Sequence, residues 1–146
     1  MKELTECLNT KRKIDEINDK LYELRAAILS PKAQIITGMP RSGSGGDNAI
    51  EKYEVKAEAL QEKLKRLYDY QEEQWEKVIT IATVAGVSAI DMELLYFRFI
   101  KGLSWKVCTF EMKKKYKWWN INTTFRKYRE ALRRMEKVPS MYTKTY

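Results

Sequence analysis

The chain has 146 residues, among them 28 Lys or Arg and 20 Asp or Glu, and its formal net charge is +8. With two cysteines and no histidine, its composition argues against a disulfide framework and against a zinc site. Because the sequence has neither the start of a signal peptide nor an apolar run near the roughly 18 residues of a membrane span, we expect a cytoplasmic protein with no membrane partner.

Residues 3–29 are expected to form one long helix. Apolar residues recur at intervals of three and four along this stretch, which is typical of a coiled-coil seam. A helix with such a stripe needs an apolar partner. The residues that form the seam are Cys7, Ile14, Ile17, Leu21, Leu24 and Ile28.

Residues 30–47 are expected to form a flexible connector, because the stretch is rich in glycine, serine and proline. The segment Gly38–Gly43 has the glycine spacing of a phosphate-binding loop, but Ser44 and Gly45 stand where a Lys-Ser/Thr pair should follow. We therefore interpret the stretch as a linker rather than a nucleotide site. A contact from Arg41 to DNA is the alternative.

A second long helix is expected over residues 48–84, beginning with a capping box formed by Asn48 and Glu51. Its apolar positions also alternate by threes and fours, with Gln71 and Gln74 as a polar layer on the seam. The two long helices can pair as an antiparallel hairpin within one chain, or between two chains in a homodimer. The sequence leaves both arrangements open.

After Gly86, residues 88–137 are expected to fold as three short helices in a helix-turn-helix arrangement. Ser88 is the N-cap of the first helix, and Gly102 ends it. Ser104 opens the second helix, which covers residues 105–112 with Val107 and Cys108 on its inner side, and residues 113–117 form the turn.

The last helix is expected to start at a cap formed by Asn120 or Asn122. Phe125, Tyr128 and Leu132 then form one apolar stripe that packs inward. Residues 138–146 have no periodicity and are expected to be a frayed tail. The outward face of the last helix is expected to carry Thr123, Arg126, Lys127, Glu130, Arg133 and Arg134.

Positive charge is concentrated at one end of the chain. Residues 101–146 contain 13 Lys or Arg against 3 Asp or Glu, whereas residues 1–100 contain 15 against 17. A segregated basic region of this kind is typical of proteins that bind a polyanion, because each neutralised phosphate releases counterions. We therefore expect double-stranded DNA as the partner.

Two segments of this region carry a family resemblance: LYFRFIKGLSW at residues 95–105 and TTFRKYREAL at residues 123–132. They resemble region 4 of sigma-70-type factors and, with the long helices before them, the ArpU-like transcription regulators of phages and prophages. The resemblance implies binding to promoter DNA in a bacterial host cell, at the nucleoid. The sequence departs from the sigma pattern at residues 113–119, where lysines and tryptophans replace small residues.

The expected DNA contacts fall into three groups. Arg126 and Lys127 are the candidates for base edges in the major groove, because they lie early in the recognition helix. Small polar groups at residues 122–124 suit base or phosphate contacts, although Asn122 can equally serve only as a cap. The remaining expected contacts, mainly to phosphates, are Ser104, Trp105, Lys106, Lys113, Lys114, Lys115, Lys117, Arg133 and Arg134.

The sequence suggests no catalytic cluster, and we expect neither enzyme activity nor a cofactor. An all-α transcription regulator that binds double-stranded DNA is the first hypothesis. The second is an interaction protein that binds RNA polymerase or another factor and has only non-specific DNA affinity. The third is a DNA-packaging adaptor similar to a small terminase subunit.

Overall fold

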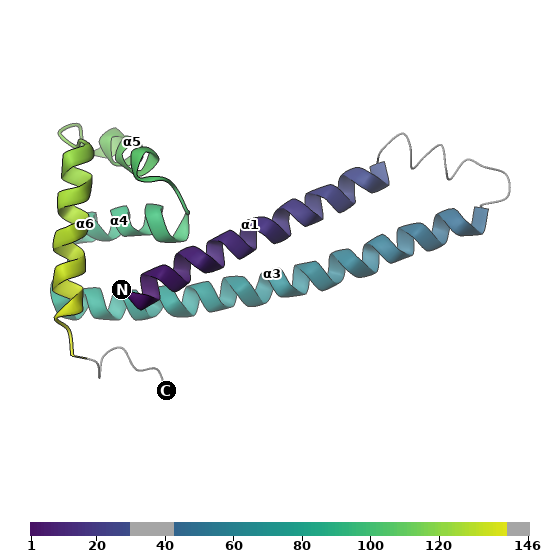
Figure 1. The fold of residues 1–146 in the computed structure, drawn as a ribbon, viewed down its shortest axis with the longest axis horizontal. Coiled ribbons are helices and arrows are strands. Elements are labelled where there is room, and N and C mark those ends of the chain that lie inside the picture. The colour runs from purple at the N-terminus through teal and green to yellow at the C-terminus, as the bar shows by residue number, and fades with distance from the viewer. Residues whose placement is uncertain (30–42, 140–146) are drawn as a thin grey trace. The chain divides into compact units, whose positions relative to one another are not determined.

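The computed structural model describes residues 1–29 and 43–139, and this part of the chain is all-helical, as the sequence predicts (Figure 1). Residues 30–42 of the expected linker, including Arg41, and residues 140–146 of the expected tail lie outside the described residues. The helices are α1 (Lys2–Leu29), α3 (Gly43–Ala85), α4 (Ala89–Leu95), the π-helix η2 (Tyr96–Ile100), α5 (Trp105–Lys115) and α6 (Ile121–Glu136).

Two helix boundaries differ from the predicted ones. Helix α3 begins at Gly43, so the expected cap at Asn48 lies inside the helix and the end of the expected linker is helical. A glycine in a helix costs only about 1 kcal/mol relative to alanine, which a helix packed further along can tolerate. Helix α5 continues to Lys115, so three of the lysines expected in a turn are helical.

The expected start and stop signals of the short helices are confirmed. The hydroxyl of Ser88 accepts a hydrogen bond of 3.2 Å from the backbone N–H of Asp91. The hydroxyl of Ser104 accepts one of 3.3 Å from the N–H of Val107. Gly86 and Gly102 follow α3 and η2 with φ angles of +75° and +69°, which only glycine adopts without strain.

The chain divides into two compact units, Lys13–Tyr68 and the combination of Met1–Arg12 with Asp69–Tyr146. In the unit Lys13–Tyr68, segments of α1 and α3 lie side by side and run in opposite directions. Leu24 and Leu60 line one groove of this unit, while Ile17 lines a second groove with Leu67. Ile17 is buried, in agreement with its expected place on the seam.

The other unit contains the start of α1, the end of α3 and all of the short helices. Its larger core cluster joins α1, the end of α3, α4, η2 and α6, because each element contributes an apolar face that is hidden from water. On the α3 seam, Gln71 is buried, and its amide donates hydrogen bonds of 3.5 Å to the carbonyls of Cys7 and Ile100. The buried residues of the cluster are Leu4, Cys7, Val78, Ile81, Ala82, Leu95, Phe99, Ala131 and Met135.

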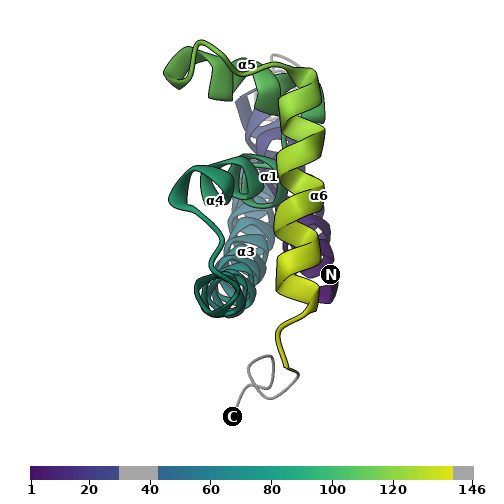
Figure 2. The ribbon, with the colours of Figure 1, turned by 90° about the vertical axis from the view of Figure 1, so that its left-hand side faces the viewer.

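A smaller core cluster fixes α5 and the turn after it. It consists of Leu94 from α4, Cys108 and Met112 from α5, and Trp119 from the turn. Helix α6 packs against both α4 and α5, as Figure 2 shows from the side of α6. The short helices are therefore held together through two sets of buried contacts, and one face of α6 is left outside them.

Candidate nucleic-acid interface

The first turn of α6 is shaped by Asn120. Its side-chain oxygen accepts hydrogen bonds of 3.0 Å from the backbone N–H of Thr123 and 3.2 Å from the hydroxyl of the same residue. Asn120 is therefore the N-cap, the first of the two residues that the sequence offers. Asn122 is not needed as a cap, and its side chain is exposed.

Thr123 and Thr124 are not available for contacts, contrary to the sequence prediction. Both are buried. The hydroxyl of Thr124 accepts a hydrogen bond of 2.8 Å from the indole of Trp119 and lies 2.7 Å from the hydroxyl of Thr109. These two threonines face inward because polar partners from the turn and from α5 meet them there. Of the two neighbouring tryptophans, Trp119 is buried and Trp118 is 59% exposed.

The inward face of α6 is only partly the predicted one. It runs through Thr124, Ala131 and Met135, with Tyr128 half-buried beside them. Phe125, which was expected inside, is 38% exposed. Tyr128 and Leu132 of the predicted stripe stay half-buried against the core, so the buried face is rotated toward Thr124 and Ala131 by less than the roughly 100° that separates consecutive residues.

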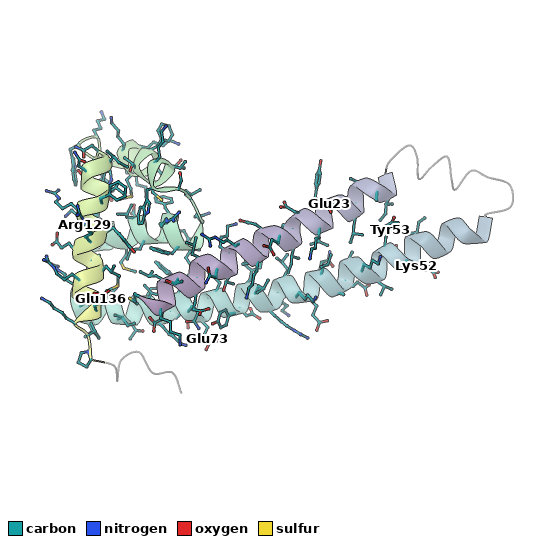
Figure 3. The ribbon with its side chains drawn as sticks, in the orientation of Figure 1. Glu23, Lys52, Tyr53, Glu73, Arg129 and Glu136 are labelled. Atoms are coloured by element: carbon teal, nitrogen blue, oxygen red, sulfur yellow. The ribbon has the colours of Figure 1, made fainter. Side chains whose placement is uncertain are left out.

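The outward face of α6 carries one amide and three guanidinium groups. Asn122, Arg126, Arg129 and Arg133 are all exposed. The spacing of four, three and four residues places them along one stripe, opposite the buried residues. Arg129, which the sequence analysis missed, belongs to this face and is labelled on α6 in Figure 3. The i, i+3, i+7 spacing of the three arginines is the signal that could have identified it.

Two cations expected on the outward face are engaged within the protein. Lys127 is half-buried and interacts electrostatically with Asp91. Arg134 forms an ion pair of 3.1 Å with Glu130 and donates a hydrogen bond of 3.3 Å to the carbonyl of Gly86. Arg134 remains half exposed in its side chain, whereas Lys127 lies at the edge of the buried face. Lys127 is thus less exposed than the arginines of α6, and its expected contact with DNA stays a prediction.

The start of α5 combines an exposed polar end with a half-buried indole. Ser104 and Lys106 are exposed. The ring of Trp105 lies 4.6 Å from that of Tyr128 and 5.9 Å from that of Phe125, measured between centroids. Trp105 therefore acts as a packing residue between α5 and α6.

Arg98 holds the indole from the other side. Its guanidinium carbon lies 5.1 Å from the ring centroid of Trp105, a cation–π distance, and the group donates a hydrogen bond of 2.9 Å to the carbonyl of Leu103. The start of α5 is thus tied to η2 as well as to α6.

The lysines at the end of α5 differ in their surroundings. Lys113 and Lys117 are exposed and form no ion pair with the described residues. Lys114 pairs with Glu111 at 3.2 Å, and Lys115 pairs with Glu93 at 3.4 Å. In the turn and at both ends of α5, the cations most open to phosphate are therefore Lys106, Lys113 and Lys117. The expected inner position of Val107 is wrong, because this side chain is exposed.

Burial perturbs several titratable groups near the interface. It raises the pKa of Asp91, although Lys127, the Ser88 hydroxyl and Arg134 act in the opposite direction. Burial likewise raises the pKa of Tyr128, and it raises that of the Cys108 thiol to about 11. In the described ranges no group of cysteines and carboxylates could hold a metal ion. No described helix is long and apolar enough to cross a membrane.

Comparisons with models of protein families, with curated proteins and with solved structures found no match to the chain.

Proposed function

We propose that the protein is a transcription regulator that binds double-stranded DNA, with α4, η2, α5 and α6 acting as a helix-turn-helix head and α6 entering the major groove. The observation that carries this proposal is the outward face of α6, where Asn122, Arg126, Arg129 and Arg133 are exposed along one stripe. Arginine and asparagine are the side chains that form bidentate hydrogen bonds with guanine and adenine edges in that groove.

The position of α5 in the chain agrees with the role of the helix that precedes the recognition helix in such a head. In helix-turn-helix proteins the helix before the recognition helix crosses the DNA backbone. The N-terminus of α5 has free amides, a serine cap and the exposed Lys106, which together favour an anionic phosphate. Lys113 and Lys117, near its other end, extend the positive surface.

The family resemblance gives the proposal its biological setting. Segments 95–105 and 123–132, which resemble sigma region 4 and the ArpU-like regulators, are the segments that form η2, the start of α5 and α6. A regulator of phage or prophage genes in a bacterial host follows from that resemblance. A homodimer through the long helices would let two heads bind half-sites about one DNA turn apart.

Selection of binding sites from random duplexes tests the proposal. The full chain should enrich a defined sequence, and gel shifts should show tighter binding to it than to random duplex of equal length. Arg126→Ala should reduce this preference about 5- to 150-fold, the range expected for loss of one bidentate base contact of roughly 1–3 kcal/mol.

The matched control is Arg66→Ala. It removes the same charge from an exposed guanidinium whose ion pair is with Glu62 on the same helix, and it should leave the sequence preference unchanged. Equal affinity of the unmodified protein for selected and random duplexes would contradict the proposal.

A second candidate function is that of an interaction protein that binds RNA polymerase. The exposed rings of Phe110 and Trp118 favour it, because aromatic side chains in contact with water are typical of protein interfaces. Recovery of polymerase from nuclease-treated lysate by the full chain, lost in a Phe110→Ala, Trp118→Ala double variant, would support this candidate. Recovery of polymerase only when DNA is intact would contradict it.

A further inference from the structure

The first two turns of α6 expose two large apolar side chains on an otherwise cationic face. Phe125 is 38% exposed and Ile121 is 40% exposed. They are four residues apart, so they lie next to each other on the helix, on the flank of the stripe formed by Asn122 and the arginines. Both side chains therefore keep apolar surface in contact with water, although the ring of Phe125 also packs against Trp105.

We propose that Phe125 and Ile121 bind the C5 methyl group of a thymine in the major groove, so that the head selects sites by an apolar contact as well as by hydrogen bonds. The inference rests on the proposed function. Thymine is the only base that presents a methyl group in this groove, and phenylalanine is a side chain that contacts it.

The surroundings of Phe125 favour DNA over a protein as the occupant. Arg126 and Arg129 flank it and are exposed, and Arg133 follows one turn later. A cationic frame around an apolar pair complements a duplex, in which thymine methyl groups lie between two rows of phosphates. The positive charge of this frame complements the phosphates of a duplex, and this complementarity favours DNA as the occupant.

The structure also restrains the side chains that would form this contact. The ring of Phe125 packs against Trp105 and, with Tyr128 and Arg129, lines a shallow hollow in the surface. The Nε of Arg129 donates a hydrogen bond of 3.3 Å to the carbonyl of Phe125. The two terminal nitrogens of Arg129 remain for the guanine edge of the adjacent base pair. The expected recognition element is thus a thymine beside a guanine.

Replacement of thymine by deoxyuridine tests the contact without any change in the protein. Deoxyuridine keeps the hydrogen-bonding groups of thymine and lacks only the methyl group. Each thymine of the selected site is replaced in turn, and Kd is measured for the full chain at constant salt. At one or two positions the affinity should fall about fourfold, the value expected for one methyl group removed from water.

Variants of the protein then assign the contact to Phe125. Phe125→Ala should bind the selected site about fourfold more weakly and should no longer distinguish thymine from deoxyuridine at that position. Phe125→Leu keeps an apolar side chain and should retain part of the difference. The matched control is Phe110→Ala, the same substitution at an exposed ring on α5, which should leave the thymine dependence unchanged.

The outcomes separate this inference from the proposed function. Enrichment of a defined site with equal affinity for thymine and deoxyuridine at every position would overturn the inference and leave the function intact. Failure to enrich any site would overturn both. A thymine dependence that persists unchanged in Phe125→Ala, together with a lower mass of that variant in light scattering, would assign the apolar pair to contact with a second copy and overturn the inference.

Discussion

The indole N–H of Trp119 donates a hydrogen bond of 2.8 Å to the hydroxyl of Thr124, and both side chains are buried. The same hydroxyl lies 2.7 Å from that of Thr109. One buried oxygen therefore connects the turn before α6, the first turn of α6 and the middle of α5. The orientation of the outward arginines depends on this connection.

Thr124→Val should reduce the free energy of unfolding by about 1–3 kcal/mol, because valine has the same shape but leaves the buried indole N–H of Trp119 without its acceptor. Urea denaturation followed by circular dichroism measures the change. Thr83→Val is the matched control, since Thr83 is exposed and its hydroxyl bonds the carbonyl of Ile79. Equal stability changes in the two variants would contradict the assigned role of Thr124.

Asp91 should make the protein more stable as the pH is lowered. Its side chain is 8% exposed, its Oδ1 has no hydrogen-bond partner in the described part, and burial raises its pKa above the ordinary value of 3.8. Between that value and the raised one, the folded state binds more protons than the unfolded state. The contribution of Asp91 to the free energy of unfolding is therefore present at low pH and is lost as the pH rises.

Asp91→Asn provides the comparison, because it removes the titration and keeps the shape of the side chain. The difference in the free energy of unfolding, unmodified protein minus variant, should increase as the pH falls from about 7 to about 4. Denaturant titrations at four pH values measure it, and titration of the other carboxylates cancels in the difference. A difference that decreases over this range would show that Lys127 and Arg134 dominate over burial.

The two thiols should be unreactive in the folded protein. Burial, with Glu3 and Glu6 nearby, raises the pKa of Cys7 to about 12, and burial raises that of Cys108 to about 11. Since the thiolate is the reactive form, an alkylating reagent at pH 8 should modify both residues slowly and then rapidly after addition of urea. Mass spectrometry of timed samples measures the rates. Fast modification of either cysteine without denaturant would contradict its burial.

Local signals in the sequence were sufficient for the helix ends of the C-terminal part. Ser88, Ser104, Gly86 and Gly102 act through their own backbone and hydroxyl groups, so no distant residue is needed to predict them. The all-helical class followed from periodicity in the same way. The start of α3 was not predictable from glycine content, because glycine lowers helix stability by an amount that packing elsewhere can offset.

The local sequence of α6 did not determine which side of the helix is buried. Phe125 is the more apolar residue, yet the neighbouring Thr124 is buried, because Trp119 and Thr109 supply hydrogen bonds to its hydroxyl from other elements. These partners become visible only once the turn and α5 are placed in space. In the same arrangement Lys127 is half-buried, whereas Arg129 is exposed on the outward side.

Arg129→Ala should therefore reduce sequence-specific DNA binding more than Lys127→Ala does. A lost bidentate contact to guanine costs about 1–3 kcal/mol, or about 5- to 150-fold in Kd for the selected site. Lys127→Ala should act mainly on folding, because it removes a positive charge that favours the ionised form of the buried Asp91. Gel shifts and thermal denaturation of both variants measure the two effects. A larger loss of binding in Lys127→Ala than in Arg129→Ala would instead indicate that Lys127 contacts the major groove.

The lysines of α5 and the following turn should determine the salt dependence of DNA binding rather than its sequence preference. Lys106, Lys113 and Lys117 are exposed, whereas Lys114 and Lys115 each have a carboxylate partner. Each phosphate contact contributes about −0.9 to the slope of log K against log salt concentration. Replacement of the first three by alanine should reduce the magnitude of the slope by roughly 2–3 while the ratio of selected to random affinity stays constant.

The double replacement of Lys114 and Lys115 by alanine is the control for this prediction. To contact a phosphate, these two lysines would first have to break their ion pairs with Glu111 and Glu93, and this cost cancels part of the free energy gained on the DNA. The slope of log K against log salt concentration should therefore change by less than about 1. Fluorescence anisotropy at several salt concentrations measures both slopes. A slope that is unchanged by the triple replacement would mean that the end of α5 does not face the duplex. A change in sequence preference would mean that these lysines contact bases in the groove.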